Sequence, residues 1–325
     1  MIEIDHVTKR YGSHTAVSDL TLTVEPGSIY GFLGPNGAGK STTMNIMTGC
    51  LSATEGTVRI EGHDIFEEPN EAKSHIGYLP EQPPVYPDMT PREYLSFVAR
   101  AKGVRGESFS SQIENALAVT QTTDVQHRLI KNLSKGYRQR VGIAQALLGN
   151  PSVVILDEPT VGLDPIQIIE IRDLIKTLGK SHTVILSSHI LSEVRAVCDQ
   201  IMIISKGKLV ASDTPDHLEK LFAGSMSLEL TLRGSQDDIR RVLGQIPGVG
   251  SLSFHSGEVD GAQGVTLETT PPADLSEAVF AACARENLPI LRMGMQKASL
   301  EDVFLELTGG ADSTTQENAE GRPVA

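Results

Sequence analysis

A glycine-rich segment near the N-terminus has the residue types and spacing of a phosphate-binding loop. It matches the pattern Gly-x-x-x-x-Gly-Lys-Ser/Thr, with Lys40 and Ser41 at its end. Such glycines let backbone N–H groups point inward around phosphate oxygens, while the lysine can reach the β- and γ-phosphates and the serine can ligate Mg²⁺. A chance glycine-rich turn is disfavoured, because the segment lies between an apolar run and a helical pattern. The residues expected to bind nucleotide here are Gly34, Pro35, Asn36, Gly37, Ala38, Gly39, Lys40, Ser41 and Thr42.

Two acidic residues follow a second apolar run. The four residues 153–156 predict a buried strand, and Asp157 and Glu158 come directly after it. Because ligands bind at the carboxyl edge of a parallel sheet, we expect Asp157 to hold Mg²⁺ through water and Glu158 to polarise an attacking water. The alternative, a strand that ends in two solvated acids, loses weight once the upstream phosphate loop is considered.

The elements that must position these residues alternate along the chain. Apolar strands are predicted at 29–33, 153–156, 183–188 and 201–204, with helices at 42–48, 165–178 and 190–198 between or after them, which indicates a parallel sheet with crossover helices. Residues 1–24 alternate with a period close to two and predict β structure. From about 91 to 150 the apolar spacing is helical.

The pattern changes after about residue 222. Strands are predicted at 227–233, 249–254, 264–269 and 289–295, and helices at 236–246 and 274–287. The order βαββαβ fits a small ferredoxin-like domain. We expect Ser299 to cap a last short helix that ends at Leu307, and residues 310–325, which are polar and without periodicity, to be a disordered tail.

Composition limits the classes of function. The formal net charge of −13 argues against non-specific nucleic-acid binding, so we expect no nucleic-acid partner. The sequence opens without a signal-peptide pattern and has no apolar run of membrane-spanning length, which predicts a cytoplasmic protein. The three cysteines, Cys50, Cys198 and Cys283, have no metal-ligand spacing.

Further motifs make the chain resemble the nucleotide-binding subunit of an ABC (ATP-binding cassette) transporter over residues 1–220. The segment 133–137, Leu-Ser-Lys-Gly-Tyr, is similar to the family signature Leu-Ser-Gly-Gly-Gln, and 162–164 resembles the D-loop. His189 is similar to the switch histidine, and Tyr11 to the aromatic residue that stacks on adenine. The simpler interpretations are that Tyr11 is a core residue and that His189 is a structural histidine.

The resemblance implies an α/β fold: a P-loop NTPase cassette with a mixed, RecA-like core sheet, an antiparallel β subdomain and a helical subdomain at about 90–150. The domains expected are the cassette at 1–220, a small C-terminal α+β domain at 225–309, ferredoxin-like in order, and the tail at 310–325.

The resemblance also assigns roles to individual residues. Glu158, His189 and Lys40 are the implied catalytic residues, and Asp164 the D-loop acid. Ser134, Lys135 and Gly136 are expected to contact the ATP held by a second copy of the chain. The signature departs from the family pattern, with Lys135 in place of glycine and Tyr137 in place of glutamine.

The metal ligands implied are Ser41 and Asp157, together with a Q-loop residue. The family has glutamine where this chain has Glu81, and Gln82 follows, so the Mg²⁺- and permease-facing role stays divided between Glu81 and Gln82.

The partners implied are a second copy of the chain and a separate integral-membrane permease, with ATP and Mg²⁺ as cofactors. The run from Ala298 to Gly309 resembles the tail of ABC-2-type exporter ATPases of the daunorubicin-resistance and gliding-motility kind. This predicts an exporter ATPase on the inner face of the membrane. The alternatives are a soluble ABC ATPase outside transport and a nucleotide-gated regulator with little turnover. The sequence does not indicate the transported substrate.

Overall fold

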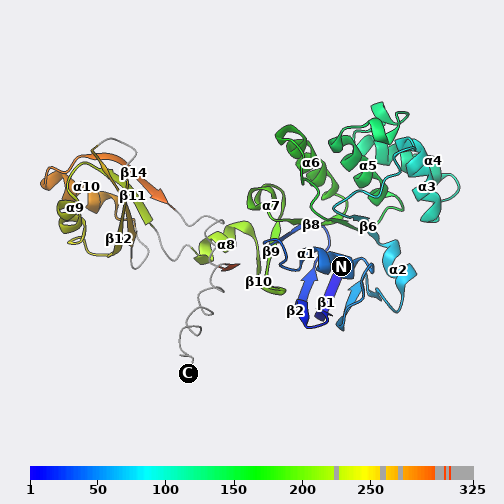
Figure 1. Cartoon of the computed structure of the whole chain (residues 1–325), viewed down its shortest axis with the longest axis horizontal. Coiled ribbons are helices and arrows are strands. Elements are labelled where there is room, and N and C mark those ends of the chain that lie inside the picture. The colour runs from blue at the N-terminus through cyan, green and yellow to red at the C-terminus, as the bar shows by residue number, and fades with distance from the viewer. Residues whose placement is uncertain (223–226, 257–260, 270–273, 297–303, 305–306, 309–325) are drawn as a thin grey trace, which may run out of the picture. The chain divides into compact units, whose positions relative to one another are not determined.

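The computed structural model describes residues 1–222, 227–256, 261–269, 274–296, 304 and 307–308. The chain forms two compact units, Met1–Pro215 and Asp216–Ala325, here called unit 1 and unit 2 (Figure 1). The predicted tail at 310–325 and most of the predicted last helix lie outside the described residues.

A six-stranded sheet of order β10-β9-β3-β8-β7-β6 crosses unit 1. Its strands are β3 (Ile29–Leu33), β6 (Ile76–Leu79), β7 (Val153–Leu156), β8 (Thr183–Ser188), β9 (Gln200–Ser205) and β10 (Lys208–Asp213). Neighbours pair in parallel, except β9 with β10. Every residue of β3, β7 and β8 is buried, as in strands covered on both faces. The parallel pairing brings the carboxyl ends of these three strands to one edge.

A second, antiparallel sheet of order β2-β1-β4-β5 packs against the first through a shared core. It consists of β1 (Ile2–Tyr11), β2 (His14–Val24), β4 (Glu55–Ile60) and β5 (His63–Asp64). The core contains Ile2 and Val58 from this sheet, Phe32 and Ile155 from the larger one, and Met44 of α1 (Lys40–Met47). The helix that follows the phosphate loop is therefore fixed between the two sheets.

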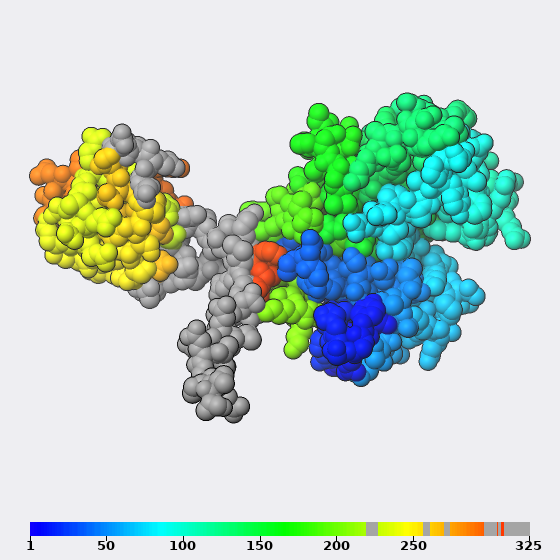
Figure 2. Space-filling model, in the orientation of Figure 1, coloured from blue at the N-terminus to red at the C-terminus, as the bar shows by residue number. Residues whose placement is uncertain are grey.

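Most of the other helices of unit 1 fall into two groups. A segment with its own hydrophobic core contains α3 (Pro91–Ala101), α4 (Ser108–Val119), η1 (Thr123–Val125), η2 (Ile130–Asn132) and α5 (Lys135–Leu147). Figure 2 shows its surface, cyan to green, as a region separate from that of the dark-blue first strands. Helices α6 (Pro165–Leu178) and α7 (Leu191–Val197) follow β7 and β8 and pack on the six-stranded sheet.

Unit 2 has the predicted βαββαβ order. It runs β11 (Ser227–Leu232), α9 (Gln236–Leu243), β12 (Val249–Ser256), β13 (Gln263–Thr269), α10 (Ser276–Arg285) and β14 (Ile290–Gln296). The sheet order is β12-β13-β11-β14 and every pair is antiparallel, as a ferredoxin-like arrangement requires. Its core joins both helices to one face of the sheet.

Several elements differ from the expectation. Helix α1 begins at Lys40 rather than at residue 42, so Lys40 and Ser41 belong to its first turn. The elements α2 (Pro69–Ser74), β6, β10 and α8 (Pro215–Phe222) were not assigned from the sequence. Strand β10 is half-exposed throughout and shows no buried run, and α2 has six residues, too few for a periodic pattern.

Candidate nucleotide site

The phosphate loop connects β3 to α1 and ends with Lys40 folded back onto it. Gly37 and Gly39 have positive φ values of 80° and 108°, where a side chain would be strained. A Cβ at Gly39 would also lie 2.6 Å from the carbonyl oxygen of Ala16. The buried Lys40 Nζ donates to the carbonyl oxygen of Gly34 at 2.8 Å and to that of Pro35 at 3.4 Å. The loop therefore holds an ammonium group beside the N-terminus of a helix, and both attract anions.

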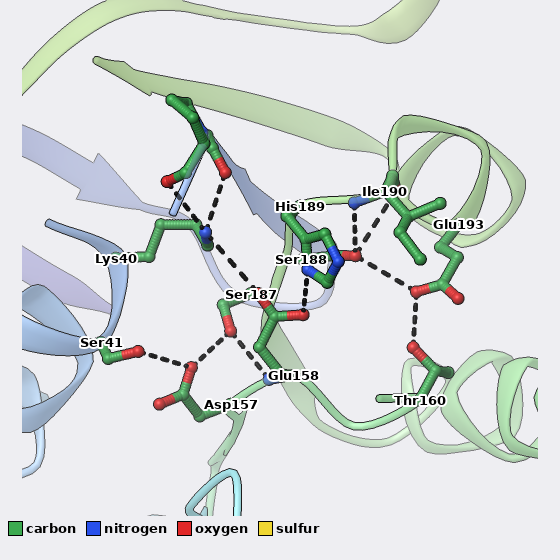
Figure 3. A network of polar contacts seen from close by, with 12 residues as sticks. Lys40, Ser41, Asp157, Glu158, Thr160, Ser187, Ser188, His189, Ile190 and Glu193 are labelled. Carbon is green, nitrogen blue, oxygen red and sulfur yellow. Dashed lines mark hydrogen bonds and ion pairs between the residues drawn. The ribbon is translucent and has the colours of Figure 1, made fainter. Parts of the chain in front are cut away.

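The two acids at the end of β7 lie directly beside this loop (Figure 3). Asp157 Oδ1 accepts hydrogen bonds from Ser187 Oγ at 2.5 Å and from Ser41 Oγ at 3.3 Å. The backbone N–H of Glu158 donates to Ser187 Oγ at 2.8 Å. Ser187 thus fixes both acids from the neighbouring strand β8, an arrangement that sequence analysis did not predict.

Glu158 has a left-handed backbone, with φ of 47°, which is uncommon for a residue other than glycine. Its side chain is almost fully buried between Lys40 and His189 (Figure 3). Oε2 lies 3.0 Å from Nδ1 of His189, and Oε1 lies 3.6 Å from Lys40 Nζ. Strained backbones of this kind cluster at functional sites, where the surrounding structure fixes them. Here the turn aims a carboxylate toward the phosphate loop, where it could accept a proton from water.

Lys40, Glu158 and His189 line a hollow of about 420 Å³, which the edges of both sheets form together. Asp157 does not line it and reaches it through its hydrogen bond to Ser41, which does. Tyr11, at the end of β1, is 49% exposed and lines it, so its ring is open to a flat ligand. Of the two Q-loop candidates, Glu81 lines the hollow and Gln82 does not. The described lining residues are Tyr11, His14, Ala16, Asn36, Gly37, Gly39, Lys40, Ser41, Thr42, Glu81, Glu158, Val161 and His189.

The remaining predicted loop residues do not line the hollow. The carbonyl groups of Gly34 and Pro35 bind Lys40, and Ala38 is buried in the core between the sheets. His14, Ala16 and Val161 line the hollow without having been predicted from the sequence. The sequence did offer one signal that Ser187 and Ser188 belong to the site, because these two residues come immediately before His189.

The signature-like segment lies at a second hollow, of about 370 Å³. Ser134 caps α5 by accepting a hydrogen bond from the backbone N–H of Tyr137. The Tyr137 hydroxyl donates to Asp124 Oδ2 at 3.0 Å, and this hydrogen bond raises the pKa of Tyr137. The described lining residues are Gln121, Asp124, Ser134, Gly136, Tyr137, Arg140, Gln167 and Glu170.

Two further predicted residues connect this segment to the start of α6. Asp164 caps α6 by accepting from the backbone N–H of Gln167 at 2.9 Å. Lys135 lines neither hollow, and its ammonium group lies against Gly162, where a Cβ would collide with it. Among the described residues, the two hollows have no lining residue in common.

The sequence is similar to those of known proteins. The model of the ABC transporter family matches residues 17–161. The chain is 35% identical over 312 residues to the bacitracin transport ATP-binding protein BcrA of Bacillus licheniformis, with 95% of this chain and 98% of that protein covered. It is 29% identical over 310 residues to the linearmycin resistance ATP-binding protein LnrL of Bacillus subtilis (strain 168), with 95% and 98% covered.

A solved structure supports the same relationship. A dimeric ATP-binding cassette in a post-hydrolysis state, bound to ADP and Pi, matches with a TM-score of 0.59 and 26% identity. The match covers 66% of this chain and 98% of that chain. Within the described part of the chain, none of the helices has both the length and the apolar character that crossing a membrane requires.

Proposed function

The chain belongs to the family of ABC transporter ATP-binding subunits, and from this membership we propose that two copies close around two ATP molecules to drive a separate exporter permease. That the chain is the ATP-binding and ATP-hydrolysing subunit of a transporter follows from its family. The dimer, the permease and the direction of transport are the proposal.

One observation supports the proposed dimer: the phosphate loop and the signature lie at separate hollows of one chain. In a two-fold interface the same surfaces exchange places, so the signature hollow of each copy can complete the phosphate-loop hollow of the other. The solved cassette bound to ADP and Pi is a dimer, which supports this reading.

The geometry of the first hollow supports the catalytic roles proposed for its residues. Glu158 would accept a proton from the attacking water, and His189, 3.0 Å away, would hold that carboxylate in place. Lys40 would turn from the loop carbonyls to the phosphates, where its charge is worth more than in water. Tyr11 would stack on the adenine ring. Ser134, Lys135, Gly136 and Asp164 would act across the dimer interface.

The donor set fits a magnesium ion. Ser41 Oγ and Asp157 Oδ1 are 3.3 Å apart beside the phosphate loop, and hydroxyl and carboxylate oxygens are the ligands that Mg²⁺ prefers. When bound, the ion would offset negative charge on the phosphates. Because Glu81 lines the hollow and Gln82 does not, we assign the Q-loop role to Glu81.

The permease partner is proposed to bind near residues 81–90, a segment that contains Pro83, Pro84 and Pro87 and leads into α3. Tyr86 and Phe97 are about half exposed there, with ring centroids 5.5 Å apart. An exposed aromatic pair of this kind suits a protein contact. We place the subunit at the cytoplasmic face of the membrane, with residues 1–220 as the cassette and 225–309 as an accessory domain.

Export is the direction that the names of the relatives favour, and the ABC-2 type of the permease is proposed from the resemblance of residues 298–309. One relative is named for bacitracin transport and another for linearmycin resistance, and resistance fits removal of a compound.

The test uses Glu158→Gln, which should bind ATP and hydrolyse it slowly. Light scattering should find a dimer with ATP and a monomer without nucleotide. Adding Ser134→Asn keeps a residue that caps helices well but enlarges the side chain at the signature hollow, so ATP should still bind while the dimer is lost. A protein that stays monomeric with ATP, or a double variant that dimerises equally well, would contradict the proposal.

A further inference from the structure

A buried carboxylate lies behind the candidate site and takes no part in the chemistry described so far. Glu193, in the first turn of α7, is 5% exposed, and no cation pairs with it among the described residues. Its Oε2 accepts hydrogen bonds from Thr160 Oγ1 at 2.5 Å and from Ser188 Oγ at 3.1 Å (Figure 3). One carboxylate oxygen therefore holds two hydroxyl groups from different segments.

The two hydroxyl groups belong to the two segments that carry the catalytic pair. Thr160 comes two residues after Glu158 and two before Gly162, where the D-loop begins. Ser188 is the last residue of β8 and directly precedes His189. Its Oγ also accepts a hydrogen bond from the backbone N–H of Ile190 at 3.0 Å, which holds the turn at His189.

Burying the Glu193 carboxylate costs free energy that a purely structural contact would not require. Burying a carboxylate is unfavourable unless strong hydrogen bonds compensate it, and an apolar side chain would fill the same space without that cost. Hydrogen bonds to a charged acceptor are short and directional, so they fix positions better than apolar packing does. Because Glu193 lies between two functional segments, its hydrogen bonds can fix the position of one segment relative to the other.

We propose that Glu193 is a positioning residue that fastens the segment from Glu158 to Asp164 to the segment that carries His189. Through Thr160 and Ser188 it keeps the Glu158 carboxylate and the His189 ring in register, so a shift of the D-loop also shifts the switch histidine. This inference rests on the proposed function, in which Glu158 and His189 act on the attacking water.

The test removes the carboxylate and then restores its acceptor. Glu193→Ala should lower kcat about 10- to 100-fold, the scale of loss when a reacting group is misplaced by about 1 Å. The affinity for ATP should change less than about twofold, because Glu193 does not line the nucleotide hollow. Glu193→Gln should recover most of kcat, since one amide oxygen can still accept both hydroxyl hydrogens.

The two hydroxyl groups can be removed separately. Thr160→Val and Ser188→Ala should each lower kcat, and neither should lower it much further in the Glu193→Ala background, because residues that act as one unit are not additive. Asp199→Ala is the matched control, because it also removes a carboxylate that accepts a hydrogen bond. Asp199 accepts from the backbone N–H of Ile29 at 2.9 Å, at the opposite end of β3 from the phosphate loop. This variant should lower the unfolding temperature while kcat of the folded protein stays unchanged.

The outcomes separate the inference from the proposed function. If Glu193→Ala keeps wild-type kcat, or loses ATP affinity as much as turnover, Glu193 does not position the catalytic pair. The inference also fails if Thr160→Val and Glu193→Ala have additive effects. If Glu158→Gln itself retains full turnover, the proposed catalytic site is wrong, whatever the Glu193 variants do.

Discussion

Replacing Glu158 by glutamine tests the catalytic assignment most directly, because the change keeps the shape of the side chain. The carboxylate lies 3.0 Å from His189 and 3.6 Å from Lys40, so the variant keeps hydrogen-bonding atoms but loses the proton acceptor. Loss of a general base typically lowers turnover by about 10²- to 10⁴-fold. We expect kcat for ATP hydrolysis to fall within this range.

The same change should strengthen ATP binding. A carboxylate about 5 Å from a phosphate oxygen repels it by about 3 kcal/mol at an effective dielectric constant of about 20. Lys40 and Mg²⁺ offset part of this repulsion. A remainder of about 1 kcal/mol would still tighten binding about fivefold.

Two measurements check these expectations. Phosphate release under saturating ATP gives kcat, and titration calorimetry at low temperature gives the affinity. Glu268→Gln in unit 2 is the matched control, because Glu268 accepts a hydrogen bond from Ser251 there and should leave both values unchanged. Turnover within tenfold of wild type, or weaker ATP binding, would refute the reasoning about Glu158.

Two further predictions concern the phosphate loop and the helical segment. Lys40→Ala removes the ammonium group beside the loop. Calorimetry should show ATP binding weakened roughly 10- to 100-fold, which is the scale of a hydrogen bond to a charged group. An unchanged affinity would show that Lys40 does not contact the nucleotide. Tyr94 is buried, and burial raises its pKa to about 12. Because the unfolded chain ionises its tyrosines near pH 10, the stability that Tyr94 contributes should be complete below pH 10 and be lost as the pH rises toward 12. Tyr94→Phe should therefore reduce the loss of unfolding free energy between pH 10 and 12 by about 1–3 kcal/mol in urea titrations, and equal losses in the two proteins would contradict this.

Local sequence predicted the elements whose ends carry strong signals. Strand β7 and helix α6 have the predicted bounds, since α6 starts at Pro165 after a capping aspartate and β7 is a continuous apolar run. Helix α5 lies in the segment whose apolar spacing predicted helix, but buried residues surround most of it. It packs against β6, β7, α3 and α4 at once, and contacts on several sides cannot be read from a single period.

The candidate site likewise combines residues that local sequence predicts with residues that only the fold brings together. The phosphate loop and the acids after β7 are contiguous motifs, so their residue types could be recognised locally. Thr160, Ser188 and Glu193 come together only because β7 and β8 pair and α7 folds back beside them. Glu193 stands in an ordinary helical segment, and nothing in its immediate sequence predicts a buried carboxylate.

The segment from Glu158 to Glu170 connects the two hollows of one chain. Glu158 and Val161 line the nucleotide hollow, whereas Gln167 and Glu170 line the signature hollow. In the proposed dimer this segment would touch one ATP through its first residues and the other ATP through its last. Glu193 holds the segment near its beginning through Thr160, and Asp164 caps the helix that forms its end. These two contacts restrict bending of the segment between the two hollows. In the proposed dimer, a displacement at the signature hollow would therefore reach Glu158 and His189 through the covalent chain and two hydrogen bonds, and we expect the two ATP sites to communicate along this route.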